Sequence, residues 1–447
     1  MIRLSAHQAA AEIRRGAATS EQLVAAYLRQ IEICEPEVQA WTFLDPAYAL
    51  EQARSADRRQ AAGLPLGALH GIPVGLKDII DTADMPTENG TVLHSGRCPE
   101  TDAGLVGALR QAGAVILGKT VTTELATYAP GKTHNPHDAA HTPGGSSSGS
   151  AAAVAAGMVP LAVGSQTNGS TIRPAAYCGV FGYKPSFGLI PRDGMLKQSP
   201  HLDQVGLFAR CIEDLALLAE QLVGYSAKDP ATRPRARPSL LRTAMEVPAV
   251  APRLAFVRTP RWDRLAADTA RGFALLLGRL GKSCEEAAGP VEALDVWELL
   301  ATVMEAEIAA SFAPQYATGR SHLSVSLQGQ IERGAKVSAL DYQRALEKIQ
   351  PMNRAFDSIF DRYDAILTPA VAGTAPAGLA STGNPEFCTP WTFCGMPALS
   401  LPLLTGDNGL PIGVQLVGRH GDDARLLRTA NWLQAALPPI PINCSKV

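Results

Sequence analysis

Three short segments of this chain carry the residue types of a serine-based hydrolytic site. Lys77 follows an apolar run, residues 144–150 form a loop of glycine and serine, and Ser170 follows small and polar residues. A neutral lysine can accept a proton from a serine hydroxyl, and converging backbone N–H groups can hold a negatively charged oxygen. Together the segments predict nucleophilic catalysis by a serine that a lysine activates.

Lys77 is the only charged residue of segment 69–77. A single lysine is most often solvated at a protein surface, but this apolar context favours burial. Burial lowers the pKa of a lysine toward the range in which its neutral amine acts as a base. Asp78 beside it could equally have a surface role.

Taken alone, the loop 144–150 fits two other interpretations, a flexible linker and a phosphate-binding loop. A phosphate loop is disfavoured because neither the Gly-Lys-Ser/Thr ending nor the Gly-x-Gly-x-x-Gly pattern occurs there. A linker is disfavoured because an alanine-rich helix pattern and a strand pattern follow directly.

The elements around these segments predict an α/β fold. Apolar runs indicate strands over 69–75, 114–117 and 159–163, and helix patterns over 102–111 and 149–156 alternate with them. The lysine is therefore expected just beyond a strand end, and the second serine after the strand that ends at 163.

The remaining elements continue this alternation. Strands are predicted over 253–257, 365–367, 399–403 and 411–417, and helices from the Thr19 cap, over 297–308, from the Ser338 cap and from 422. The helix that begins after Ser338 is expected to be long and kinked at Pro351. Segment 230–248, rich in Pro, Arg and Ala, predicts a surface connection.

Composition indicates an enzyme of the cytoplasm that acts on small molecules. The chain has 447 residues, 46% hydrophobic and 18% charged, and a net charge of -2, which disfavours nucleic acid and anionic membranes as partners. The N-terminus lacks the apolar core of a secretory signal, and the uncharged stretch 151–164 is too short to cross a bilayer.

Cysteine and histidine spacing predicts no metal and no cofactor. The eight cysteines include no Cys-x-x-Cys pair and are expected to be free thiols: Cys34, Cys98, Cys178, Cys211, Cys284, Cys388, Cys394 and Cys444. The nine histidines show no metal-ligand spacing, and His134, His137 and His141 are interpreted as loop residues.

The joint pattern closely resembles the amidase signature family. The matching segments are 69–78, 143–150, 164–183 and 408–415. The resemblance implies a single α/β/α domain over residues 1–447, with a central mixed, mostly parallel twisted sheet flanked by helices. It also implies a helical region at about 290–362 that covers the substrate.

Carried over residue by residue, the resemblance assigns Lys77 as the base, Ser146 as a bridging serine after a cis peptide, and Ser170 as the nucleophile. The separation of 24 positions between the two serines is the usual one in the family. The oxyanion hole is expected from the backbone N–H groups of Thr167, Asn168, Gly169 and Ser170.

Three positions depart from the family pattern. Ser148 stands where the family loop has a glycine, and Gln166 stands where many members have an aspartate. Arg173 is also displaced by one position from the family's arginine. A buried Asp–Arg pair behind the nucleophile is therefore not expected in its usual form.

The prediction that follows is hydrolysis of a carboxylic amide, with carbamates and esters as further candidates, through an acyl-enzyme on Ser170. Two alternatives stay open: the glutaminase subunit of a tRNA-dependent amidotransferase, which would require partner subunits, and an inactive binding protein on the same fold. The family also suggests a homodimer. The substrate pocket is expected to include Tyr128, Trp391, Phe393 and Cys394.

Overall fold

Eleven strands join in one continuous sheet in the computed structural model, which describes residues 1–437. The strands are β1 (Trp41–Leu44), β2 (Pro73–Lys77), β3 (Val115–Thr120), β4 (Leu161–Gln166), β5 (Phe181–Lys184), β6 (Gln204–Ala209), β7 (Leu254–Val257), β8 (Cys284–Ala287), β9 (Ala365–Pro369), β10 (Ala398–Thr405) and β11 (Pro411–Val417). Their order across the sheet is β1-β3-β2-β4-β6-β5-β10-β11-β9-β7-β8.

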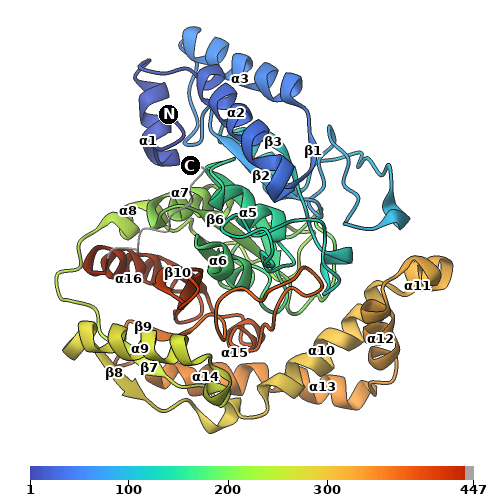
Figure 1. Ribbon diagram of the computed structural model, residues 1–447, viewed down its shortest axis with the longest axis vertical. Coiled ribbons are helices and arrows are strands. Elements are labelled where there is room, and N and C mark those ends of the chain that lie inside the picture. Colours follow the sequence, from blue (N-terminus) through green and yellow to red (C-terminus); the bar gives the residue numbers. More distant parts are fainter. Residues whose placement is uncertain (438–447) are drawn as a thin grey trace.

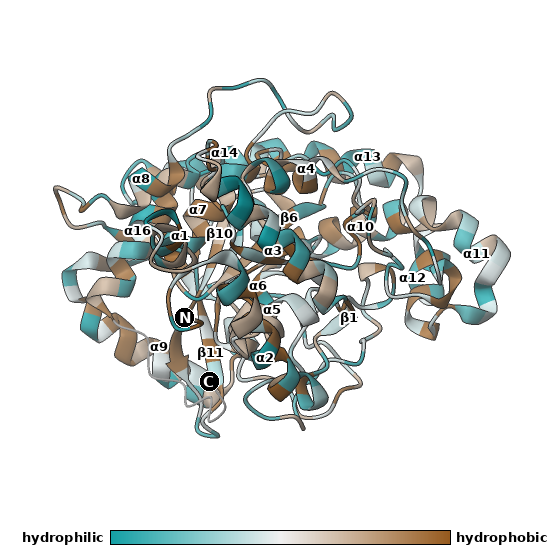
Figure 2. Cartoon of the chain, turned by 90° about the horizontal axis from the view of Figure 1, so that it is seen from above, coloured by the Kyte–Doolittle hydropathy of each residue, from teal (hydrophilic) through white to brown (hydrophobic). Residues whose placement is uncertain are grey.

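Helices flank this sheet (Figure 1). They are α1 (Ala6–Arg14), α2 (Ser20–Val38), α3 (Pro46–Ala61), α4 (Gly104–Gln111), α5 (Ser148–Ala155), α6 (Ile172–Cys178), α7 (Ile212–Leu222), α8 (Leu240–Met245), α9 (Ala267–Leu280), α10 (Val296–Ser311), α11 (Ala313–Gly319), α12 (Val325–Gly334), α13 (Ala339–Glu347), α14 (Ile349–Phe360), α15 (Thr389–Phe393) and α16 (Asp423–Ala436). In Figures 1 and 2, α11 and α12 project at the end of the molecule opposite α9. No helix within residues 1–437 is long and apolar enough to cross a membrane.

The α/β class and the single mixed sheet are confirmed, but the expectation that the sheet is mostly parallel is wrong. Six of the ten neighbouring strand pairs are antiparallel, and only the pairs β2–β3, β2–β4, β7–β8 and β7–β9 are parallel. A short turn joins β10 to β11, and a tight connection of this kind produces antiparallel neighbours, whereas parallel neighbours need a crossover such as α4 or α5.

Most predicted elements are present, with two corrections. The strand predicted over 69–75 is β2, so Lys77 is its last residue and does not lie beyond it. The helix predicted from Ser338 is two helices, α13 and α14, which divide at Lys348. Pro351 lies in the first turn of α14, and the interruption at Lys348 falls one turn before it, because proline has no N–H to donate and its ring clashes with the carbonyl four residues earlier, that of Glu347.

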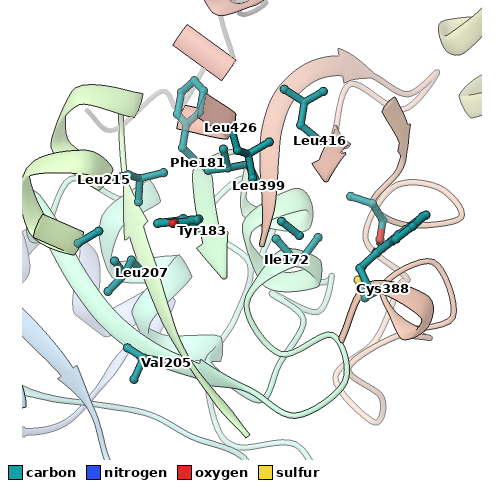
Figure 3. Packing of buried hydrophobic residues seen from close by; sticks show 14 of the residues in the cluster. Ile172, Phe181, Tyr183, Val205, Leu207, Leu215, Cys388, Leu399, Leu416 and Leu426 are labelled. Carbon is teal, nitrogen blue, oxygen red and sulfur yellow. Dashed lines mark hydrogen bonds between the residues drawn. The ribbon is translucent and has the colours of Figure 1, made fainter. Parts of the chain in front are cut away.

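The core beneath the site is apolar and draws on both halves of the chain. Figure 3 shows Ile172 of α6, Tyr183 of β5, Leu207 of β6 and Leu399 of β10 converging there, all of them fully buried. Burial of apolar surface is worth about 25 cal/mol per Å², so this contact fixes α6, and with it the loop that precedes α6, against the sheet.

Candidate active site

Lys77 is held at the end of a central strand with its amine in the protein interior. β2 runs parallel to both β3 and β4, so all three strands end at the same edge of the sheet. Lys77 has no exposed surface, and its Nζ lies 2.7 Å from Ser146 Oγ and 2.8 Å from Ser165 Oγ. Burial lowers the lysine pKa well below its ordinary value, which the charge of Asp203 opposes. The arrangement favours a neutral amine in contact with two hydroxyls.

Ser146 lies in a loop that crosses the ends of these strands. The Gly145–Ser146 peptide bond is cis, as the resemblance implies. The carbonyl of Ser146 accepts a hydrogen bond from the Thr123 N–H at 3.3 Å. Ser147 N–H in turn donates to the carbonyl of Ser170 at 3.3 Å, which places the two serine loops side by side.

Position 149 of this loop requires a glycine, because neighbouring backbone leaves no room for a Cβ. A Cβ on Gly149 would lie 2.3 Å from the Ala40 carbonyl oxygen and 2.4 Å from the Val121 nitrogen. Ser148, where the family has glycine, is the first residue of α5 and its hydroxyl reaches the Val121 carbonyl at 3.4 Å. The loop therefore accommodates a side chain at Ser148, whereas a side chain at Gly149 would meet backbone atoms.

We expect Gly149→Ala to lower the free energy of unfolding by about 3 kcal/mol, because the backbone atoms on both sides of the new Cβ cannot move aside. Gly107→Ala in α4 is the matched control, because nothing lies within 4 Å of a Cβ at that helical position. It should gain about 0.5–1 kcal/mol from reduced freedom of the unfolded chain. Urea denaturation measures both, and equal effects at the two sites would contradict this account of the loop.

Ser170 follows β4 and precedes α6, and 9% of its surface is exposed. Within residues 1–437 the backbone N–H groups of Asn168, Gly169 and Ser170 donate to no other residue. The turn is held by Thr392, whose hydroxyl donates to the Asn168 carbonyl at 2.6 Å. Thr389 donates to the Asn168 side chain at 2.9 Å. These three N–H groups, and that of Thr167, which likewise donates to no other described residue, are thus available to a negatively charged oxygen beside Ser170.

Gln166 takes over the local role of an acidic residue without its charge. Its Oε1 accepts from the N–H groups of Thr171 at 2.9 Å and Ile172 at 3.0 Å, and its Nε2 donates to Thr392 Oγ1 at 2.7 Å. One amide therefore supports the first turn of α6 and the α15 residue that holds Asn168. A carboxylate could not donate to Thr392.

Arg173 is buried and bonds to neutral acceptors. Its guanidinium donates to the carbonyls of Gly145 at 2.6 Å and Gly383 at 2.8 Å, and to Thr382 Oγ1 at 3.1 Å. Burial lowers the pKa of this group. Arg173 thus links α6 to the loop that carries Ser146 and to a loop at the outer surface, in place of an Asp–Arg pair.

Two cavities flank the Ser170 loop. The outer cavity, about 520 Å³, borders Asn168 and is lined by Tyr128, Trp297, Leu300, Met304 and the Glu305–Arg333 ion pair. The inner cavity, about 290 Å³, borders Ser165 and Thr167 and includes Asp203 and Gln198. The inner cavity carries more charged side chains, and the outer cavity combines an aromatic and apolar wall with polar residues such as Gln330, Asn384 and Glu386.

Of the four residues predicted for the pocket, Tyr128 lies on the outer cavity. Trp391 lies on a separate cavity and packs against Phe356 with ring centroids 5.1 Å apart. Phe393 and Cys394 are buried in the hydrophobic core on and just after α15. The expectation that these three face the substrate is corrected, because α15 turns its apolar side to the core and uses Thr389 and Thr392 to hold the Ser170 loop.

Sequence analysis missed two polar residues of the site, Ser165 and Asp203. Val163 of β4 pairs with Leu76 of β2, so Ser165, two residues later, comes beside Lys77. Asp203 immediately precedes β6, whose Gln204 pairs with Gln166, and its carboxylate contacts the Thr167 hydroxyl at 2.7 Å. Strand register is the signal that would have found them, and a single sequence does not supply it.

The histidines and cysteines are engaged locally. His134 Nδ1 lies 2.7 Å from the Ala139 carbonyl, His137 Nε2 lies 2.8 Å from the Cys178 carbonyl, and His141 lies 2.9 Å from the Asp138 carboxylate. Across residues 1–437, no three His, Cys, Asp or Glu side chains are grouped to hold a metal ion. Cys98, Cys211, Cys284, Cys388 and Cys394 are free thiols, and Cys444 lies outside the described residues.

We expect activity to survive exhaustive chelation, because Lys77, Ser146 and Ser170 would supply the base, the relay and the nucleophile without a metal. The measurement is turnover before and after prolonged dialysis against EDTA. Loss of activity that zinc restores would contradict this expectation and would direct attention to His134, His137 and His141.

Comparison with known proteins agrees with this geometry. A family model described as Amidase matches residues 22–427. A glutamyl-tRNA(Gln) amidotransferase subunit of Anaeromyxobacter dehalogenans is 33% identical over 99% of this chain and 98% of that protein. A putative amidase, AmiD, of Mycobacterium tuberculosis is 32% identical over 94% of this chain and 92% of that protein.

One solved structure matches this chain with a TM-score of 0.90 and 26% identity. It is a vestigial protein complex that bears on the evolutionary origins of an s-triazine catabolic enzyme. The match covers 97% of this chain and 98% of the other. The two chains therefore share one fold over nearly their whole length.

Proposed function

The chain belongs to the amidase family, and we propose that it hydrolyses a carboxylic amide through an acyl-enzyme formed on Ser170. It is an amidase, an enzyme that acts on linear carbon–nitrogen amide bonds. The observation that carries the proposed mechanism is the 2.7 Å contact between the buried amine of Lys77 and the hydroxyl of Ser146. That contact gives the serine loop a base where water cannot compete.

In the proposed reaction the neutral Lys77 takes the proton of Ser146 while Ser146 takes the proton of Ser170. The Ser170 oxygen bonds to the amide carbon, and the carbonyl oxygen becomes an anion held by the N–H groups of residues 167–170. The Lys77 ammonium then returns its proton through Ser146 to the leaving nitrogen. The C–N bond breaks, and water hydrolyses the acyl-enzyme by the same proton path.

We propose that the substrate is a small molecule entering through the outer cavity, beneath the helical region at about 290–362. Trp297, Leu300 and Met304 of α10 give this cavity an apolar and aromatic wall, which favours an aryl or alkyl group beside the scissile bond. The test is a panel of aryl amides, aliphatic amides, carbamates and esters. Nitrogen-rich amides belong on the panel because one structural relative bears on the evolutionary origins of an s-triazine catabolic enzyme. No turnover of any carbon–nitrogen substrate would contradict the proposal.

A second candidate, the glutaminase subunit of a tRNA-dependent amidotransferase, is favoured by the identity to the glutamyl-tRNA(Gln) amidotransferase chain. The departures from the family pattern at Gln166 and Arg173 disfavour this assignment as a glutaminase subunit. Copurification of partner chains, with glutaminase activity only in the complex, would support this alternative. An inactive binding protein is disfavoured because Lys77 and Ser146 are in contact and Ser170 lies in the adjoining loop.

We further propose a cytoplasmic homodimer without nucleic-acid or membrane partners. The near-neutral net charge of -2 supports the exclusion of polyanionic partners. Sedimentation velocity of the purified chain tests the oligomeric state, and a monomer at micromolar concentration would contradict the dimer.

A further inference from the structure

Asp203 is a carboxylate beside the site for which the mechanism above has no role. It immediately precedes β6, and the register Gln166–Gln204 places it next to Thr167 at the end of β4. Thr167 Oγ1 lies 2.7 Å from Asp203 Oδ1 and 2.8 Å from Gln198 Oε1. Oδ2 accepts from the N–H groups of Gln198 and Ser199, each at 2.9 Å. These donors hold the carboxylate in one position.

The sheet places Asp203 and Lys77 on opposite sides of β4. β2 and β6 are the two neighbours of β4, and Lys77 and Asp203 lie at the same edge of the sheet. Lys77 contacts Ser165, and Asp203 contacts Thr167, two residues further along, so both contacts are made on one face of the chain. Ser165, Thr167 and Asp203 line the same inner cavity.

Within residues 1–437 Lys77 has no carboxylate in contact, although the proposed reaction makes it an ammonium ion in the protein interior. A buried cation is costly unless a negative charge offsets it. The charge that acts on Lys77 is that of Asp203. Arg192 pairs with Asp229 at 2.7 Å and donates to the Asp203 backbone carbonyl, and its positive charge also acts on the Asp203 carboxylate, whose pKa it lowers. The remaining charged or titratable groups around the inner cavity are Asp193, Lys197, His201 and Lys228.

We propose that Asp203 is a positioning residue that holds the Thr167 side of the Ser170 loop and supplies the negative charge that offsets the Lys77 ammonium. This inference rests on the function proposed above. It assigns to the inner cavity an electrostatic role in the proton relay, while the outer cavity admits the substrate.

Asp203→Asn is a clean test, because the surrounding hydrogen bonds fit an amide. The new Oδ1 can accept from the N–H groups of Gln198 and Ser199, and the new Nδ2 can donate to the Thr167 hydroxyl. Thr167 then donates to Gln198 Oε1, which it already approaches at 2.8 Å. The substitution removes the charge and retains every contact.

The experiment measures the inactivation rate by an alkyl fluorophosphonate as a function of pH, so it needs no known substrate. Inactivation forms a bond from Ser170 Oγ to phosphorus, breaks the P–F bond and releases fluoride, and the serine proton passes through Ser146 to Lys77. The rate requires neutral Lys77, so it falls as pH falls through the pKa of Lys77. Burial raises the pKa of Asp203 to about 6, so the comparison is made above that pH, where the carboxylate is charged.

Loss of the negative charge should lower the pKa of Lys77 further, because Asp203 favours the ammonium form. The acidic limb of the profile should therefore move to lower pH by about 0.5–1 unit in Asp203→Asn, and the plateau rate should fall about tenfold. Asp203→Glu keeps the charge and should retain the wild-type limb. Asp193→Asn removes a carboxylate that lines the same cavity without contacting Thr167, and should leave the profile unchanged.

If the acidic limb of the pH–rate profile does not move in Asp203→Asn while the plateau rate falls, the inference is overturned and Asp203 is a purely structural group. The same shift in Asp193→Asn would overturn it as well. If Asp203→Asn does not fold by circular dichroism, Asp203→Ala removes the charge at a cavity wall and is judged by the same limb. Absence of labelling at Ser170 in the unmodified protein would instead contradict the proposed function itself.

Discussion

Replacing Ser170 by alanine is expected to reduce amide turnover by about 10⁴-fold or more, the largest effect of any substitution in this chain. The N–H groups that would hold the oxyanion are those of Ser170 and the residues just before it, and the Ser170 loop adjoins the one that carries Ser146. A sulfonyl fluoride or a fluorophosphonate should label the unmodified protein at Ser170, which peptide mass spectrometry can locate. The Ser170→Ala protein should not be labelled.

Ser148→Ala is the matched control for this prediction. Ser148 lies in the same serine-rich loop as Ser146, but its hydroxyl reaches only the Val121 carbonyl at 3.4 Å. It should be labelled at Ser170 at the normal rate. Labelling at Ser147 or Ser148, with Ser170 untouched, would contradict the assignment of the nucleophile.

Replacing Lys77 by alanine is expected to lower activity on both amides and activated esters, and to lower it more on the amide. An amine leaves only when protonated, whereas an activated ester expels a good leaving group without a proton. The amide loss should be at least the ~10²–10⁴-fold typical of general acid–base catalysis. Matched amide and ester substrates with the same acyl group measure the difference. An equal or larger loss on the ester would contradict the return of the proton by Lys77.

Lys77→Met is the matched control for Lys77→Ala, because methionine fills the same buried space without an amine. If both variants lose activity by the same factor, the cause is the missing amine and not a cavity left by the smaller side chain. In the unmodified enzyme, acylation should rise with pH through the lowered lysine pKa and then level off, since burial disfavours the ammonium and only the neutral amine accepts a proton. A rate that falls with rising pH through the neutral range would contradict a lysine base.

Residue types and spacing determined the chemical groups of the candidate site. Lys77 in an apolar run, the serine-rich loop 144–150 and the small residues before Ser170 were readable in the chain. The resemblance to the amidase signature family assigned the roles of Ser146 and Ser170, and the structure brings Lys77 and Ser146 into contact. Alternating helix and strand patterns also predicted the α/β class. These properties are local, because short stretches of sequence encode turns, caps and apolar periodicity.

Only the tertiary structure decided how distant segments meet. The antiparallel majority of the sheet depends on which strands pair, so it is not encoded in one segment. The same holds for Trp391, Phe393 and Cys394, whose aromatic and apolar character suits a pocket and a core equally. Ser165 joined Lys77, and Asp203 joined Thr167, through the register of β2, β4 and β6, and register is set by hydrogen bonds between strands far apart in the chain.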